Sequence, residues 1–189
     1  MSNASINTLQ INLALTKAAT DQLQKSLGDF KSDILIQELT PMQKKFGNPK
    51  SWNIFSSKSK NAAITIVNRK LQPVIAESKQ NLVAVKLQTG KQSTTFISAY
   101  NSPYANIEET LKEIQEMITS LKVEPIFIGT DFNGRHTLWG YRDNDARGEN
   151  VLDFLLANDL YVINRPETPP TFQRHLQGLA RFNHLAHKA

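Results

Sequence analysis

The sequence of 189 residues contains no cysteine. Disulfides, cysteine-based metal sites and cysteine nucleophiles are therefore excluded, and a reducing compartment is compatible with the chain. No apolar run approaches the roughly 18 residues that a membrane-spanning helix needs. The first ten residues, MSNASINTLQ, lack the positive start and apolar segment of a secretory signal. We therefore expect a soluble, intracellular protein.

Neither the composition nor the charge is extreme. Hydrophobic residues make up 40% of the chain and charged residues 21%, as in ordinary globular proteins. The length, with no internal repeat, predicts one domain with enough core to fold independently. The net charge of +5 is compatible with nucleic-acid binding, and equally with proteins that never contact nucleic acid.

Residues 126–140, IFIGTDFNGRHTLWG, contain the densest group of candidate functional residues. The short apolar run at 126–128, bounded by Pro and Gly, predicts a buried strand that ends in turn-forming residues. Asp131 and Asn133 follow at its carboxyl end, where ligands bind in α/β sheets, and Phe132 between them is predicted to face the core. Asp131 offers an oxygen ligand to Mg²⁺, and Asn133 offers an amide donor and a carbonyl acceptor. The alternative is that Asp and Asn serve only as turn formers.

The order Asp131, Asn133, His136, Trp139, Gly140 resembles the D-x-N-x-x-H-x-x-W-G run of one group within the endonuclease/exonuclease/phosphatase superfamily. That group is the endonuclease domain of non-LTR retrotransposons, which precedes their reverse transcriptase. The resemblance implies a four-layer α/β sandwich of the DNase-I-like type, with two mixed sheets flanked by helices. It also implies Mg²⁺ as cofactor, DNA as partner and a nuclear site of action. We expect His136 and Trp139 to support the loop rather than to act in catalysis.

Two further residues match the superfamily near the N-terminus. A strand is predicted at 9–15, a helix at 16–28 and a strand at 33–38. The resemblance implies that Asn12 in the first strand and Glu38 at the end of the second help to hold the metal and the scissile phosphate. A Glu at a strand end is otherwise an ordinary solvated edge residue.

The middle of the chain alternates between predicted strands and helices. Strands are expected at 62–68, 82–87, 94–99 and 160–164, and helices at 106–121 and 149–157. Tyr100 follows the third of these strands, and the resemblance implies that its hydroxyl lies near the scissile phosphate. Residues 39–60 are predicted to form a polar loop, which is either a solvated face or a set of phosphate contacts. Its lysines are Lys44, Lys45, Lys50, Lys58 and Lys60.

The resemblance covers about residues 9–172, which leaves 1–8 as an N-terminal tail and 173–189 as an unrelated basic tail. It implies two further motifs, an S-x-I-D-L-T strand and a strand ending in Ser-Asp-His, and neither occurs. The tail contains His175, His184 and His187 but no acid, and we expect these histidines to be exposed. We expect the domain to be incomplete and less stable, with an open sheet edge that a helix through Leu176, Leu179 and Phe182 partly covers.

Three functions follow from these expectations. The first is a Mg²⁺-dependent endonuclease domain that nicks target DNA to prime reverse transcription and is impaired by the missing motifs. In it, Asp131 activates or orients water, Asn133 supports it, and Tyr100 stabilises charge on the phosphate. The second is a catalytically inactive remnant that at most binds nucleic acid. The third is a phosphatase or phospholipase of the same superfamily.

Overall fold

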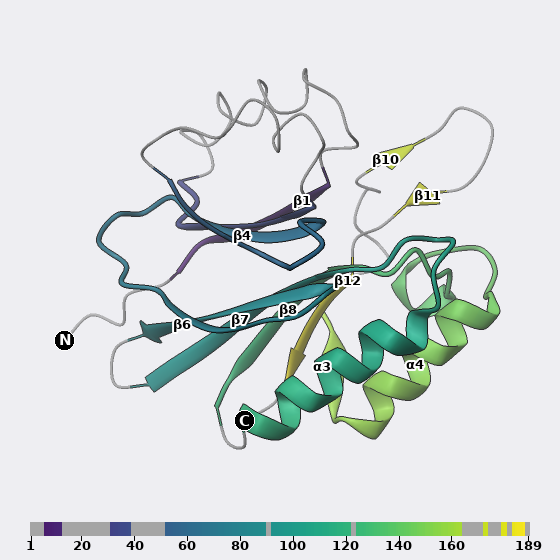
Figure 1. Ribbon diagram of the computed structural model, residues 1–189. Coiled ribbons are helices and arrows are strands. Elements are labelled where there is room, and N and C mark those ends of the chain that lie inside the picture. Colours follow the sequence, from purple (N-terminus) through teal and green to yellow (C-terminus); the bar gives the residue numbers. More distant parts are fainter. Residues whose placement is uncertain are drawn as a thin grey trace.

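The computed structural model describes residues 6–12, 31–38, 52–89, 92–121, 124–163, 172–173, 179–180 and 183–187. At residues 12, 38 and 89, and beyond 163, the description covers the main chain. Two β-sheets stack face to face, and helices α3 (Ile107–Leu121) and α4 (Ala146–Ala157) cover the outer face of the larger sheet (Figure 1). This is the predicted sandwich of two mixed sheets with helices outside.

The smaller sheet has four strands in the order β1-β2-β4-β3. Its strands are β1 (Thr8–Asn12), β2 (Ile34–Glu38), β4 (Ala62–Ile66) and β3 (Asn53–Ser56). The first two are parallel and end in register, with Asn12 opposite Glu38. The other pairings are antiparallel.

The larger sheet has six strands in the order β5-β6-β7-β8-β12-β9. They are β5 (Val74–Ser78), β6 (Leu82–Thr89), β7 (Gln92–Tyr100), β8 (Ile126–Asp131), β12 (Asn183–His187) and β9 (Leu160–Val162). Only β7 and β8 are parallel, and they also end in register, with Tyr100 opposite Asp131. A separate ribbon pairs β10 (Phe172–Gln173) with β11 (Leu179–Ala180).

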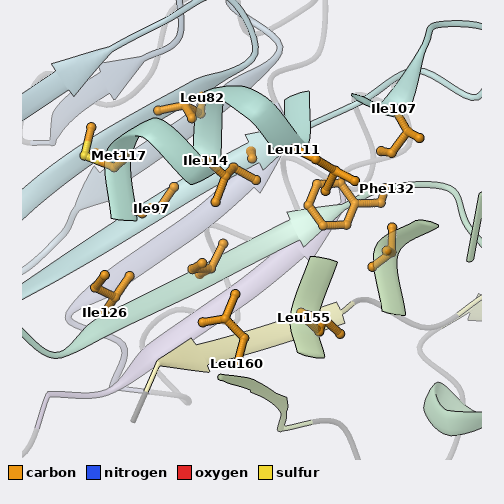
Figure 2. Close-up of a cluster of buried hydrophobic side chains, with 14 of the residues drawn as sticks. Leu82, Ile97, Ile107, Leu111, Ile114, Met117, Ile126, Phe132, Leu155 and Leu160 are labelled. Carbon is orange, nitrogen blue, oxygen red and sulfur yellow. The ribbon is translucent and has the colours of Figure 1, made fainter. Parts of the chain in front are cut away.

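The main core lies between the larger sheet and the two helices. Side chains of α3, including Ile114 and Met117, pack over alternate residues of β7 and β8, such as Ile97 and Ile128 (Figure 2). Phe132 is fully buried in this cluster, as predicted. Asn106 caps α3 by accepting a hydrogen bond from Glu108 N at 3.0 Å.

The second core lies between the two sheets, and the sheets approach each other closely at Gly129. A Cβ atom added there would lie 2.6 Å from Ile36 Cγ2 and 2.9 Å from Gln10 Oε1. Gln10 Nε2 donates a hydrogen bond across the gap to the Thr130 carbonyl at 2.8 Å. Only glycine allows β8 to approach β1 and β2 this closely, just before the strands end.

Some expectations from the sequence are wrong. Residues 53–56, predicted as loop, form β3, and β5 was not predicted. The helix expected through Leu176, Leu179 and Phe182 is wrong at Leu179, which lies in β11. The edge of β8 is not open, because β12 of the predicted tail pairs with it. The helix expected at 16–28 lies outside the described residues. Among those described, no helix is long and apolar enough to cross a membrane.

Candidate active site

The site lies where two pairs of parallel strands end. Asn12 and Glu38 end β1 and β2 in one sheet, and Tyr100 and Asp131 end β7 and β8 in the other. A small pocket between the sheets is lined by Ile11 and Gln37, the residues just before Asn12 and Glu38, and by Tyr100 and Asp131. The fold therefore brings four of the predicted residues, from four segments of the chain, to one edge.

Two glutamine side chains line the pocket. Gln10 Oε1 and Gln37 Oε1 are buried beside it and accept no hydrogen bond from the part of the chain that the structure describes. Gln37 Nε2 donates to Thr65 Oγ1 at 3.0 Å, which fixes the amide. Such acceptors suit a donor or a cation that enters the pocket.

Asp131 and Asn133 are positioned by one tight turn. Asn133 has a φ of 54°, in the left-handed region that Asn tolerates better than most residues. Its backbone N–H donates to Asp131 Oδ1 at 3.1 Å, and its Nδ2 donates to the Asn101 carbonyl at 3.0 Å. The half-buried Asp131 and the exposed Asn133 are thus fixed relative to the loop that follows Tyr100.

Asn101 and Arg147 hold that loop in place. The buried Asn101 donates from Nδ2 to the Asn106 carbonyl at 3.0 Å and to Thr110 Oγ1 at 2.8 Å. The Arg147 guanidinium donates to Asn101 Oδ1 and to the carbonyls of Phe132 (2.5 Å), Ser102 (2.7 Å) and Ala105 (2.9 Å).

Burial lowers the pKa of Arg147, and the carboxylates of Asp145 and Asp131, with the ionisable Tyr100 hydroxyl, partly oppose this shift. Arginine remains charged at any physiological pH. The guanidinium is therefore a fixed positive charge whose field reaches both Asp131 and Tyr100.

His136 and Trp139 lie under the loop after Asn133. Trp139 is fully buried, and its Nε1 donates to the Gly134 carbonyl at 3.0 Å. The buried His136 accepts from Leu138 N at 3.1 Å through Nδ1, at the start of the 3₁₀ turn η1 (Thr137–Trp139). Its ring centroid lies 4.9 Å from that of Trp139. These contacts hold the loop and leave neither ring facing the pocket.

The first turn of α4 packs closely against the same loop. A Cβ atom at Gly148 would lie 1.9 Å from the Arg135 carbonyl oxygen. Asp145 caps the helix, accepting from Gly148 N at 2.7 Å and from Arg135 N at 3.1 Å. Burial alone would raise the pKa of Asp145, but these hydrogen bonds and the Arg135 side chain outweigh it, so the pKa is lowered.

A histidine of the predicted tail reaches this edge of the sheet. β12 runs antiparallel to β8, with Asn183 opposite Thr130 and His184 opposite Gly129. His184 is therefore the second residue of β12, beside the carboxyl-terminal half of β8. His187 lies at the other end of β12, opposite Ile126.

The oxygen donors at this edge suit Mg²⁺, which prefers carboxylate and amide oxygens. Asp131 supplies a carboxylate there, and the main chain brings Asn12 and Glu38 to the same edge. Among the described side chains, which do not include those of Asn12 and Glu38, no three acidic or histidine groups gather into a metal site.

The sequence reasoning missed Asn101, Arg147 and the position of His184. Asn101 and Arg147 carry no signal of their own, because their role depends on contacts between segments 46 residues apart. The position of His184 also depends on long-range contacts, because residues 183–187 form a strand by pairing with β8 and β9.

Part of the chain matches known proteins in sequence. Residues 94–179 match the family model described as "Endonuclease-reverse transcriptase". A "Probable RNA-directed DNA polymerase from transposon BS" of Drosophila melanogaster is 30% identical over 92 residues, which are 49% of this chain and 10% of that protein. The chain thus spans about a tenth of the length of this curated relative.

Solved structures share the whole fold. The endonuclease domain of TRAS1, a telomere-specific non-LTR retrotransposon, is 23% identical with a TM-score of 0.85, over 97% of this chain and 86% of that domain. A humanized TDP2 of D. rerio has a TM-score of 0.68 at 15% identity, over 97% of this chain and 84% of that one. A 3′ phosphatase, NExo, from Neisseria has a TM-score of 0.66 at 15% identity, over 97% and 87% of the two chains. Over residues 94–179 the chain is therefore similar to endonuclease-reverse transcriptases, and its fold is of the DNase-I-like type.

Proposed function

We propose that the chain is a Mg²⁺-dependent DNA endonuclease domain that nicks target DNA to prime reverse transcription. The observation that carries this proposal is the meeting of Asn12, Glu38, Tyr100 and Asp131 at one edge between the two sheets. The transposon origin of its relatives supports DNA as the substrate and priming as the purpose of the nick.

Asp131 and Asn133 act on the attacking water. The Asp131 carboxylate accepts a proton as the water oxygen forms its bond to phosphorus. Asn133, whose Nδ2 is held by the Asn101 carbonyl, orients the water by accepting a hydrogen bond from it through its amide oxygen. Tyr100 donates a hydrogen bond from its hydroxyl to a non-bridging oxygen, where negative charge develops.

Mg²⁺ held by Glu38, with Asn12 nearby, would neutralise the phosphate and stabilise the leaving 3′ oxygen. The bond from phosphorus to that oxygen breaks as the bond to water forms. The products are a 5′ phosphate and a 3′ hydroxyl, and the 3′ hydroxyl is the end that a reverse transcriptase extends.

His184 supplies the imidazole that the missing Ser-Asp-His motif would otherwise provide. Its support is the register of β12, which starts at the carboxyl end of β8. An imidazole at this edge protonates the leaving oxygen or stabilises charge on the phosphate. Asn183 offers no carboxylate to fix the imidazole, so activity is lower than in a relative with aspartate there.

A second candidate function is a nucleic-acid-binding remnant without catalysis. The observation that favours it is the absence of any acid from residues 173–189, which include β12. Such a protein would keep the DNA-binding surface and lose the proton transfers.

Nicking of supercoiled plasmid with Mg²⁺ separates the two candidates. The endonuclease converts plasmid to open circles, and we expect Asp131→Ala to lower the rate at least about a hundredfold, as for loss of a general base. Asp153→Ala, which removes an exposed carboxylate from α4, should nick like the original chain. A folded chain that retains plasmid in a gel shift but never nicks it would support the remnant instead.

A further inference from the structure

The loop after Tyr100 presents an aromatic ring to solvent. Tyr104 is 98% exposed, the most exposed of the large hydrophobic side chains that the structure describes. It makes no contribution to either core. A fully exposed tyrosine carries about 150 Å² or more of ring surface that a partner can cover.

The main chain under Tyr104 is held from several directions. Arg147 donates to the Ser102 and Ala105 carbonyls, on either side of the tyrosine. Ala105 N also donates to the Ser102 carbonyl at 3.0 Å, closing a tight turn around Tyr104. The ring is therefore carried on a fixed support, which lowers the entropy lost when it binds a partner.

This support is shared with the candidate active site. Arg147 also contacts Asn101, whose carbonyl positions Asn133. Tyr104 is four residues from Tyr100, so their Cα atoms lie at most about 14 Å apart. DNA rises 3.4 Å per nucleotide along one strand, so this span is about four nucleotides.

We propose that Tyr104 is a base-stacking residue that packs against a nucleobase within about four nucleotides of the phosphodiester bond held at Tyr100 and Asp131. An aromatic ring suits this role because every base has a π face, whereas a charged side chain would reach only the phosphates. The inference rests on the proposed function, since it takes DNA as the substrate.

A tryptophan at this position reports stacking directly. On DNA addition in EDTA, which prevents cleavage, the emission of Tyr104→Trp should be quenched, after subtraction of the signal of the unsubstituted chain with Trp52 and Trp139. Inorganic polyphosphate, a polyanion without bases, should give no quenching. The matched control is Tyr161→Trp, at an exposed tyrosine of β9.

The affinity for DNA gives the second readout. Tyr104→Ala should weaken binding by about five- to a hundredfold, the range for one stacked base, while Tyr104→Phe and Tyr161→Ala bind like the original chain. Equal quenching by polyphosphate and DNA, or equal binding by Tyr104→Ala and the original chain, would overturn the stacking role while leaving the nuclease proposal intact. If the original chain neither binds nor nicks DNA, both proposals fall.

Discussion

At the scale of single residues, Arg147 links the residues of the candidate active site to the surrounding loops by hydrogen bonds. One guanidinium satisfies three backbone carbonyls and the Asn101 side chain, and its charge also acts on Asp131 and Tyr100. Lysine cannot replace this planar set of donors, although it keeps the charge.

We expect Arg147→Lys to lower the free energy of unfolding by about 2 kcal/mol, because charged hydrogen bonds are lost and buried acceptors remain. Nicking should fall more than tenfold at a temperature where the variant is fully folded, since Asn101 no longer holds Asn133. Urea unfolding and plasmid nicking measure the two effects. Arg142→Lys, at an exposed arginine, serves as the control. Full activity of Arg147→Lys would contradict the positioning role.

At the scale of elements, β12 determines whether a histidine lies near the candidate active site. It has two histidines in one strand, His184 beside the end of β8 and His187 at the opposite end. This gives a comparison of the same residue type in the same element at two distances from the site.

His184→Ala should lower the nicking rate about a hundredfold if the imidazole takes part in proton transfer, whereas His187→Ala should leave it unchanged. Nicking that survives His184→Ala undiminished would remove the histidine from the mechanism. A loss in both variants would instead point to damage to the sheet.

Elements also show where sequence-based expectations succeed. β2 and β8 were predicted because they are short apolar runs that end in polar turn residues, a local property. β12 was not, since NHLAH becomes a strand only through pairing with β8 on one side and β9 on the other. β5 was missed because it is an edge strand with mostly exposed side chains and an irregular register, so no apolar pattern marks it.

The same division holds for the candidate site. Asp131, Asn133 and Tyr100 were predicted from motifs and from the resemblance, because these can be read in short stretches of sequence. Asn101 and Arg147 were found only in the structure, because their hydrogen bonds join loops that are distant in the sequence.

At the scale of the whole molecule, positive charge is placed along the edge that carries the site. The turn between β3 and β4 exposes Lys58 and Lys60 beside the end of β2, where Glu38 pairs with Ala62. This turn is fixed to the β5–β6 turn, since Lys58 N donates to the Lys79 carbonyl at 2.8 Å and Ser59 N to the Gln80 carbonyl at 3.1 Å. A DNA backbone that enters the site from this side passes both lysines.

Replacing Lys58 and Lys60 together by Gln should weaken DNA binding. The negative slope of log affinity against log salt should become shallower by about two, one for each lost phosphate contact. Replacing Lys31 and Lys70, at the opposite edge, by Gln removes the same charge and should change the slope little. Each pair also includes one lysine with a positive φ, Lys31 in one and Lys60 in the other, so the two double variants are matched in backbone conformation. Equal slopes for the two double variants would mean that net charge, and not this edge, governs binding.

The place of β12 also constrains the order in which the protein can fold during its synthesis. β8 and β9 are neighbours only through β12, which follows them by more than 20 residues. A ribosome that has released residues up to 163 has exposed both strands but not the one that joins them. The edge of β8 that pairs with β12 therefore stays unpaired until residues 183–187 have been synthesised. During this time the unpaired strand edge can associate with other nascent chains.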